Sequence, residues 1–216
     1  MKHYIIIGMD KFGYNLALAL AQRQHKVTVI DKDEKKIQDI SDKVSVAVIA
    51  DARDEKVLAK LVEDFADAVI VSLGSDIASS VLAVLNLQSL GIKDIIAKAI
   101  NKNHGRILEL TGATEVIYPQ RDRAIALAIK LTTKNLIEHI PMADEYSIVE
   151  IAIPENLIGK KLSELKLRNK YGVEIIAIKD VLHDEFYLVP EPSYVIKADS
   201  AFVVIGKAVN IEKLKL

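Results

Sequence analysis

Six short apolar runs, separated by segments with helical periodicity, are the feature that most constrains the fold. The runs are Tyr4–Ile7, Val27–Ile30, Val46–Ile49, Ala68–Val71, Asp94–Ala97 and Val116–Tyr118. Most of them are continuously apolar, which is typical of strands buried on both faces of a parallel sheet. The helical segments between them are Gly13–Gln24, Glu34–Asp42, Glu55–Glu63, Ile77–Ser89 and His104–Leu110. This alternation predicts an α/β fold with a Rossmann-like, doubly wound parallel sheet.

The pattern changes after Pro141 and predicts a second, smaller α/β domain. Its expected strands are Tyr146–Ile153, Val173–Ile178, Phe186–Val189 and Ala201–Ile205, with a short helix around Leu162–Leu165. We therefore place the boundary near Ile140, with residues 1–140 forming the nucleotide-binding domain and residues 141–216 the second domain.

The segment that joins the two domains, Arg121–His139, is predicted to be one long helix. It carries two apolar stripes, Ile125/Ile129/Leu136/Ile140 and Leu127/Leu131. An ordinary surface helix shows a single stripe. The extra apolar side chains, like those at Val81–Leu87, indicate either packing beneath the chain's own sheet or burial against another subunit.

A degenerate dinucleotide-binding turn follows the first strand. Its residues are Gly8, Met9, Asp10, Lys11, Phe12 and Gly13. In the pattern G-x-G-x-x-G, the first glycine allows the tight turn and the third allows close packing of helix on strand. The second glycine lets the backbone approach a pyrophosphate. Because Asp10 stands at that second position, it places a side chain and a negative charge where phosphate is expected.

Asp31 at the end of the second strand supports nucleotide binding. It lies 23 residues after Gly8 (31 − 8). The fingerprint expects an acidic residue about 20 residues on, where it accepts hydrogen bonds from the ribose hydroxyls of adenosine. Asp31 and the adjoining Lys32 are therefore candidate binding residues.

Further candidates follow the later strands. They are Asp51 and Ala52 after the third strand, Ser72, Leu73 and Gly74 after the fourth, Lys98 after the fifth, and Gln120 and Arg121 after the sixth. These residues should gather at the carboxyl edge of the sheet, where open α/β folds bind ligands.

Composition excludes several classes of function. The sequence has no cysteine, which excludes disulfides, thiolate metal sites and cysteine nucleophiles. Its net charge of −1 lacks the basic excess of a nucleic-acid binder. No stretch reaches the ~18 apolar residues of a membrane span, and the first apolar run is too short for a signal peptide. We therefore expect a cytoplasmic protein whose membrane role, if any, goes through a partner.

No catalytic constellation emerges from the sequence, so we expect the protein not to be an enzyme. The five histidines are scattered and mostly flanked by charged residues, and we expect each of them at the surface. They show none of the H-x-x-x-H or H-E-x-x-H spacings of metal sites.

The chain resembles the regulator-of-potassium-conductance (RCK) family, the cytoplasmic regulatory subunits of Ktr and Trk potassium-uptake systems. The resemblance covers nearly the whole chain. In the first domain it rests on Ile5–Gly8, Gly13, Val29–Asp31, Ala68–Val71, Ala97–Ala99, Gly112-Ala113 and Ile117–Pro119. In the second it rests on Asp144–Glu150, Ile158–Leu162, Leu165, Arg168, Tyr171–Val173, Ile175–Ile178, Asp199 and Val204–Gly206.

The resemblance implies a ring of eight subunits beneath a membrane pore protein, gated when an adenine nucleotide such as ATP or ADP binds the first domain. Because Asp10 brings a negative charge to the phosphate position, we expect weak discrimination between ATP and ADP, or a preference for ligands with less phosphate charge, such as AMP or NAD. The resemblance also implies a divalent cation in some members, and cyclic di-AMP between two second domains in others. We favour the view that the second domain here only dimerises, because Arg168 is a lone arginine near the matching strand.

Three residues depart from the family. Asp10 replaces a glycine, Lys11 an arginine near the terminal phosphate, and Gln120 a glutamate linked to the cation.

Two other functions stay open. A nicotinamide-dependent oxidoreductase shares Gly8, Gly13 and Asp31, although it also needs a proton donor beside the nicotinamide. Alternatively, Asp10, Asp31 and Asp51 could form a cation sensor without nucleotide, because carboxylate oxygens suit calcium or magnesium.

Overall fold

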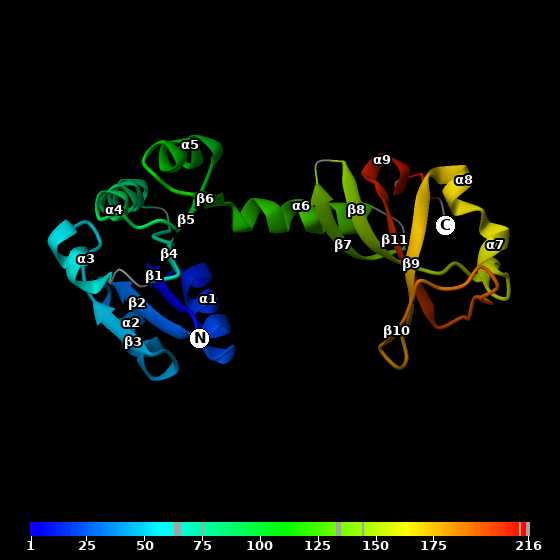
Figure 1. Ribbon diagram of the computed structural model, residues 1–216, viewed down its shortest axis with the longest axis horizontal. Coiled ribbons are helices and arrows are strands. Elements are labelled where there is room, and N and C mark those ends of the chain that lie inside the picture. The colour runs from blue at the N-terminus through cyan, green and yellow to red at the C-terminus, as the bar shows by residue number, and fades with distance from the viewer. Residues whose placement is uncertain (63–65, 75, 133–134, 144, 212, 215–216) are drawn as a thin grey trace. The chain divides into compact units, whose positions relative to one another are not determined.

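The computed structural model describes residues 1–216 except 63–65, 75, 133–134, 144, 212 and 215–216. It divides into two compact units, Met1–Asp122 and Arg123–Leu216 (Figure 1). Among the described residues, no helix is long and apolar enough to cross a membrane.

The first unit is a parallel sheet of six strands with helices between them. Its strands are β1 (His3–Ile7), β2 (Lys26–Asp31), β3 (Val46–Ile49), β4 (Ala68–Val71), β5 (Ile95–Lys98) and β6 (Glu115–Ile117). Its helices are α1 (Lys11–Gln22), α2 (Glu34–Ile40), α3 (Glu55–Leu61), α4 (Ile77–Ser89) and α5 (Lys102–Leu110), with a 3₁₀ turn at Ser41–Lys43. The strand order β3-β2-β1-β4-β5-β6 is that of the doubly wound Rossmann fold, which confirms the predicted fold class.

Two apolar clusters cover the two faces of this sheet. Ile6 faces a cluster completed by α1 and α2, whereas Ile5 and Ile7 face a cluster completed by α3, α4 and α5. All three isoleucines are fully buried, as continuously apolar strands predict. The edge strand β3 differs, because Val46 and Ile49 are 41% and 53% exposed.

Short polar side chains begin the helices that follow the strands. Asp10, Asp33, Asp54, Asp76 and Asn101 precede α1, α2, α3, α4 and α5, and each accepts a hydrogen bond from a backbone amide of the first turn. A helix leaves its first amides without intrahelical partners, so such a cap stabilises it by about 0.5–2 kcal/mol. These caps bring several carboxylates to the carboxyl edge of the sheet.

The second unit is built on an antiparallel sheet with the order β10-β9-β11-β8-β7. Its strands are β7 (Leu136–Ala143), β8 (Tyr146–Ala152), β9 (Val173–Asp180), β10 (Glu185–Leu188) and β11 (Ser200–Lys207). The helical elements are α6 (Pro119–Thr132), which spans the division between the units, a 3₁₀ turn at Glu155–Leu157, α7 (Leu162–Leu165), α8 (Leu167–Tyr171) and α9 (Ala208–Ile211). Phe202 on the central strand β11 is fully buried in its core.

The long helix predicted for Arg121–His139 is wrong in its second half. Helix α6 ends at Thr132, and β7 begins at Leu136 and pairs with β8. The boundary expected at Ile140 thus falls inside β7, whereas the compact units divide after Asp122. Pro141 agrees with the observed strand, since proline is tolerated in an edge strand, and β7 is the edge of its sheet.

Candidate functional site

Two glycines shape the turn between β1 and α1. Gly8 has a φ of +96°, and a Cβ added to it would lie 2.2 Å from the carbonyl oxygen of Ser72. A Cβ on Gly13 would lie 2.1 Å from the carbonyl oxygen of Gly8. These close approaches need glycine at both positions, and they bring the start of α1 onto the ends of β1 and β4.

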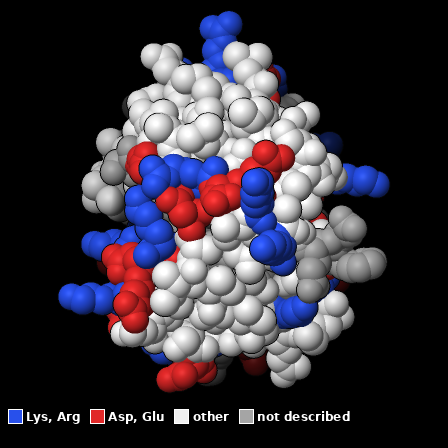
Figure 2. All heavy atoms as spheres, turned by 90° about the vertical axis from the view of Figure 1, so that its left-hand side faces the viewer, with Lys and Arg blue, Asp and Glu red and all other residues white. Residues whose placement is uncertain are grey.

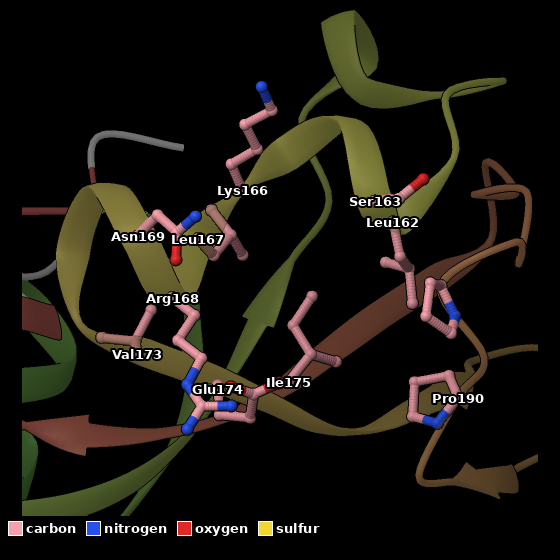
Figure 3. A pocket seen from close by; sticks show the side chains of 11 residues that line it. Leu162, Ser163, Lys166, Leu167, Arg168, Asn169, Val173, Glu174, Ile175 and Pro190 are labelled. Carbon is pink, nitrogen blue, oxygen red and sulfur yellow. Dashed lines mark ion pairs between the residues drawn. The ribbon is translucent and has the colours of Figure 1, made fainter.

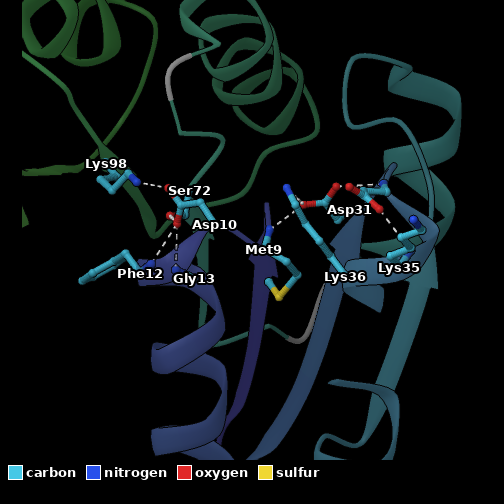
Figure 4. Close-up of polar contacts among 10 residues, drawn as sticks. Met9, Asp10, Phe12, Gly13, Asp31, Lys35, Lys36, Ser72 and Lys98 are labelled. Atoms are coloured by element: carbon cyan, nitrogen blue, oxygen red, sulfur yellow. Dashed lines mark hydrogen bonds and ion pairs between the residues drawn. The ribbon is translucent and has the colours of Figure 1, made fainter. Parts of the chain in front are cut away.

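Asp31 is buried at the end of β2 and is held in place by backbone amides. Its Oδ2 accepts a 2.6 Å hydrogen bond from the amide of Met9, and its Oδ1 accepts one of 2.9 Å from the amide of Asp33. Lys36 of α2 lies 3.5 Å from Oδ2 (Figure 4). Because a carboxylate has about four acceptor positions, Asp31 keeps capacity for a further donor.

A pocket of about 340 Å³ opens at this edge of the sheet. The predicted residues that line it are Gly8, Asp10, Asp31, Lys32, Asp51, Ala52, Ser72, Leu73 and Gly74. They come from the loops after β1, β2, β3 and β4, which meet on both sides of the strand-order reversal. This is where doubly wound sheets bind their ligands.

Seven other predicted residues do not line the pocket. Gln120 is exposed on α6. Met9 is buried in the core beneath α1 and contributes its amide to Asp31, while Phe12 and Gly13 contribute amides to Asp10. Lys11 is exposed on α1. Arg121 pairs with Asp122 and stacks on the Tyr118 ring at 3.8 Å. Lys98 is buried and pairs with Asp10.

Asp10 and Lys98 form an ion pair that joins the turn to β5 (Figure 4). Oδ2 of Asp10 contacts Nζ of Lys98, while Oδ1 accepts hydrogen bonds of 3.0 Å from the amides of Phe12 and Gly13. The Ser72 hydroxyl donates a further bond of 2.7 Å to Oδ1. Lys98 is only 4% exposed, and burial lowers the pKa of its ammonium group.

Four polar residues of the pocket are not among those predicted from the sequence. Lys36, Arg53, Asp76 and Ser79 also line it. Arg53 Nε lies 3.0 Å from each carboxylate oxygen of Asp51, and its hydrogen bonds lower the pKa of Asp51 to about 2. Arg53 and Asp76 are close in sequence to predicted residues, and Asp76 occupies the N-cap position of α4, which is a recognisable signal.

The pocket does not resemble a cation site. Asp10, Asp31 and Asp51 all line it, but each already accepts hydrogen bonds from the chain. Within the described part of the chain, no group of three or more His, Cys, Asp or Glu side chains is placed to hold a metal ion. Each carboxylate is thus engaged in organising its own loop.

The expectation that every histidine lies at the surface is wrong for His104. This side chain on α5 is 1% exposed, and its Nε2 lies 2.8 Å from Oγ of Ser80 on α4. Ser80 donates its own proton to the carbonyl of Ile77, so the imidazole Nε2–H is the donor to Ser80. Burial lowers the pKa of His104, and a neutral ring with both polar atoms engaged fits a structural role.

A second pocket, of about 290 Å³, lies in the second unit (Figure 3). Its polar lining includes Lys166, Arg168 and Glu174, beside apolar side chains such as Leu162 and Ile175. Arg168 Nε lies 3.7 Å from the Glu174 carboxylate, and the arginine side chain is 84% exposed. The arginine singled out from the sequence is thus next to a carboxylate.

Charges of both signs are mixed on the surface of the first unit. On the face drawn in Figure 2, basic and acidic side chains lie beside one another in a band, with uncharged surface above and below it. This mixture agrees with the net charge of −1.

The first unit has a Rossmann-type sheet with a pocket at its topological switch point, and family comparisons define the class of protein to which the chain belongs. Residues 4–119 match the TrkA-N domain and residues 148–216 the TrkA-C domain. The chain is 34% identical to the Ktr system potassium uptake protein C of Bacillus subtilis, over 99% of this chain and 96% of that one. The chain therefore belongs to the RCK family of potassium-transport proteins.

Solved structures agree with this assignment. The GsuK channel bound to NAD matches 97% of this chain with a TM-score of 0.66 at 23% identity. A crystal structure of GsuK bound to ADP matches 62% of this chain with a TM-score of 0.55 at 27% identity. This chain spans 38% and 35% of those two longer chains.

Proposed function

We propose that this protein is a cytoplasmic regulatory subunit that gates a membrane potassium channel or transporter when an adenine nucleotide binds its first unit. The proposal is supported by the match of both units to TrkA domains and by the likeness to a Ktr potassium uptake protein. A relative of the same fold binds ADP. The protein reaches the inner face of the membrane through its pore partner.

The position of Asp31 is the observation that carries the nucleotide part of the proposal. Its carboxylate lines the pocket and is oriented by the amides of Met9 and Asp33. An adenosine ribose placed there donates its hydroxyls to the remaining acceptor positions of the carboxylate. The purine then lies toward the loop that contains Asp51 and Ala52.

Exposed apolar side chains support the assembly of several copies of this chain. Leu82 and Leu85 on α4 and Ile125, Leu127 and Leu131 on α6 are each at least 42% exposed. Apolar surfaces on a soluble chain often mark contacts with a partner. We propose that they bury between copies of this chain in a closed ring, which carries the effect of the nucleotide to the pore.

A transport assay tests the regulatory function. Cells that contain a Ktr-type pore protein but lack its regulatory subunit receive either the native gene or Asp31→Ala. We expect native protein to restore potassium uptake, and the variant to restore less uptake or uptake that no longer follows the cellular level of adenine nucleotide. If native protein leaves uptake at the level of the empty vector while it copurifies with the pore protein, the regulatory proposal fails.

A further inference from the structure

The carboxylate of Asp10 already lies on the backbone amides that a bound phosphate would use. In a dinucleotide-binding turn, the amides at the start of the helix receive the phosphate. Here Oδ1 of Asp10 accepts hydrogen bonds from two of them, those of Phe12 and Gly13, each at 3.0 Å. The Ser72 hydroxyl adds a third bond to the same oxygen. The chain thus supplies its own anion to this position.

Lys98 pairs with the Asp10 carboxylate, which occupies the place expected for a phosphate. It supplies a positive charge to Oδ2 of Asp10 and is 4% exposed at the end of β5. Removing the partner of a buried charge strongly destabilises the folded protein. A pyrophosphate entering the turn must therefore displace the Asp10 carboxylate, and it must also replace that carboxylate as the partner of Lys98.

The remaining charges of the pocket are largely paired as well. Lys36 lies beside Asp31, and Arg53 makes paired hydrogen bonds to Asp51. Asp76, another lining residue, caps α4. With four lining aspartates and three lining lysines or arginines, the pocket has none of the positive excess that a polyphosphate chain favours.

We infer that Asp10 is a specificity-determining residue that makes the pocket select an adenine nucleoside or its monophosphate over ligands with a pyrophosphate. This inference rests on the proposed nucleotide function and specifies its ligand class. Asp31 holds the ribose, the loops after β2 and β3 hold the base, and the Asp10–Lys98 pair closes the end where a second phosphate would lie. The volume of about 340 Å³ is small for a ligand pocket and suits a nucleoside.

Calorimetry with four ligands and three proteins tests the inference. Adenosine, AMP, ADP and ATP are titrated into native protein, Asp10→Gly and Asp10→Asn at fixed salt and magnesium. We expect native protein to bind adenosine or AMP at least about tenfold more tightly than ADP or ATP. Asp10→Gly frees both amides and Lys98, so ADP and ATP should gain at least about tenfold in affinity while adenosine changes little.

Asp10→Asn separates the effect of the negative charge of Asp10 from the effect of a side chain that occupies the backbone amides. The asparagine oxygen can still accept from the amides of Phe12 and Gly13, but the side chain has lost its charge. ADP and ATP should gain less affinity from this variant than from Asp10→Gly. It also keeps the helix cap, so it provides the test if the glycine variant fails to fold in a melting experiment.

Two results would overturn the inference about Asp10 and leave the proposed nucleotide function intact. One is native protein binding ADP or ATP as tightly as adenosine, and the other is neither substitution changing the order of the four ligands. A different result contradicts the proposed nucleotide function itself, and this inference with it. That result is the absence of heat for all four ligands with all three folded proteins.

Discussion

Gly8 at the end of β1 lies so close to the carbonyl oxygen of Ser72 that a Cβ on the glycine would come within 2.2 Å of it. The two residues lie on either side of the β1–β4 boundary, where the strand order reverses and the pocket opens. The contact therefore sets how closely the turn after β1 packs against the end of β4. It also makes Gly8 indispensable for packing as well as for backbone conformation.

Gly8→Ala should destabilise the first unit far more than Gly91→Ala. Both glycines have positive φ, +96° and +78°, but a Cβ on Gly91 meets nothing within 4 Å. Each substitution incurs backbone strain of about 1–2 kcal/mol. The clash at Gly8 adds roughly 1–3 kcal/mol of overpacking. Urea unfolding measures both variants, and equal losses of unfolding free energy would contradict the close contact with Ser72.

His104 should make the protein less stable in mildly acidic solution. Burial lowers its pKa below the usual value of 6.5, so below that pH the unfolded chain binds a proton that the folded chain resists. The free energy of unfolding should therefore fall from pH 7 toward pH 5, by at most about 1.4 kcal/mol per pH unit from this group. His104→Gln should flatten the profile. A native profile identical to that of His104→Gln would contradict the account.

Assembly should depend on exposed leucines and isoleucines of α4 and α6. Leu85 is 43% exposed and Ile125 53% exposed, so a glutamate at either place leaves the chain's own core intact but adds a charge to a subunit contact. Ile129 of α6 is not a suitable position for this substitution, because its side chain packs against the core of the second unit. Light scattering should show native protein as a dimer or larger ring and the two variants as smaller species, with Gln22→Glu on α1 as the charge control. Native protein that is monomeric at micromolar concentration would contradict the prediction.

The second unit should dimerise without binding cyclic di-AMP. Arg168 is the candidate contact for its phosphates, but it is exposed and lies beside Glu174, which opposes a second anion. Titration with labelled cyclic di-AMP should therefore show no saturable binding. Saturable binding that Arg168→Ala abolishes, with the melting temperature preserved, would reverse this assignment.

The first unit could be predicted from the sequence because its signals are local. The buried strands are mostly apolar, and the turn from Gly8 to Gly13 lies within a few residues. The sequence does not reveal strand β7, because two of its apolar residues, Leu136 and Ile140, are four apart, a spacing that also fits a helix. An edge strand with one packed face gives a weaker pattern than a central strand.

The chemistry of the site was harder to predict than its location. The carboxyl edge was predicted because parallel strands place the loops that follow them at one end of the sheet. The Asp10–Lys98 pair joins residues 88 positions apart, and the partner of each carboxylate depends on side-chain direction. The burial of His104 beside Ser80 likewise depends on how α4 and α5 pack.

Adenosine binding at Asp31 is the central claim, and calorimetry of native protein, Asp31→Ala and Asp31→Asn tests it most directly. Loss of a charge-assisted hydrogen bond to the ribose costs about 1.5–3 kcal/mol, so Asp31→Ala should lower adenosine affinity at least about tenfold. Asp31→Asn keeps an acceptor for the Met9 amide, so it should retain the turn while still weakening ribose binding. Melting curves confirm that each variant is folded. Equal adenosine affinity in the native protein and both folded variants would contradict the placement of the ribose at Asp31.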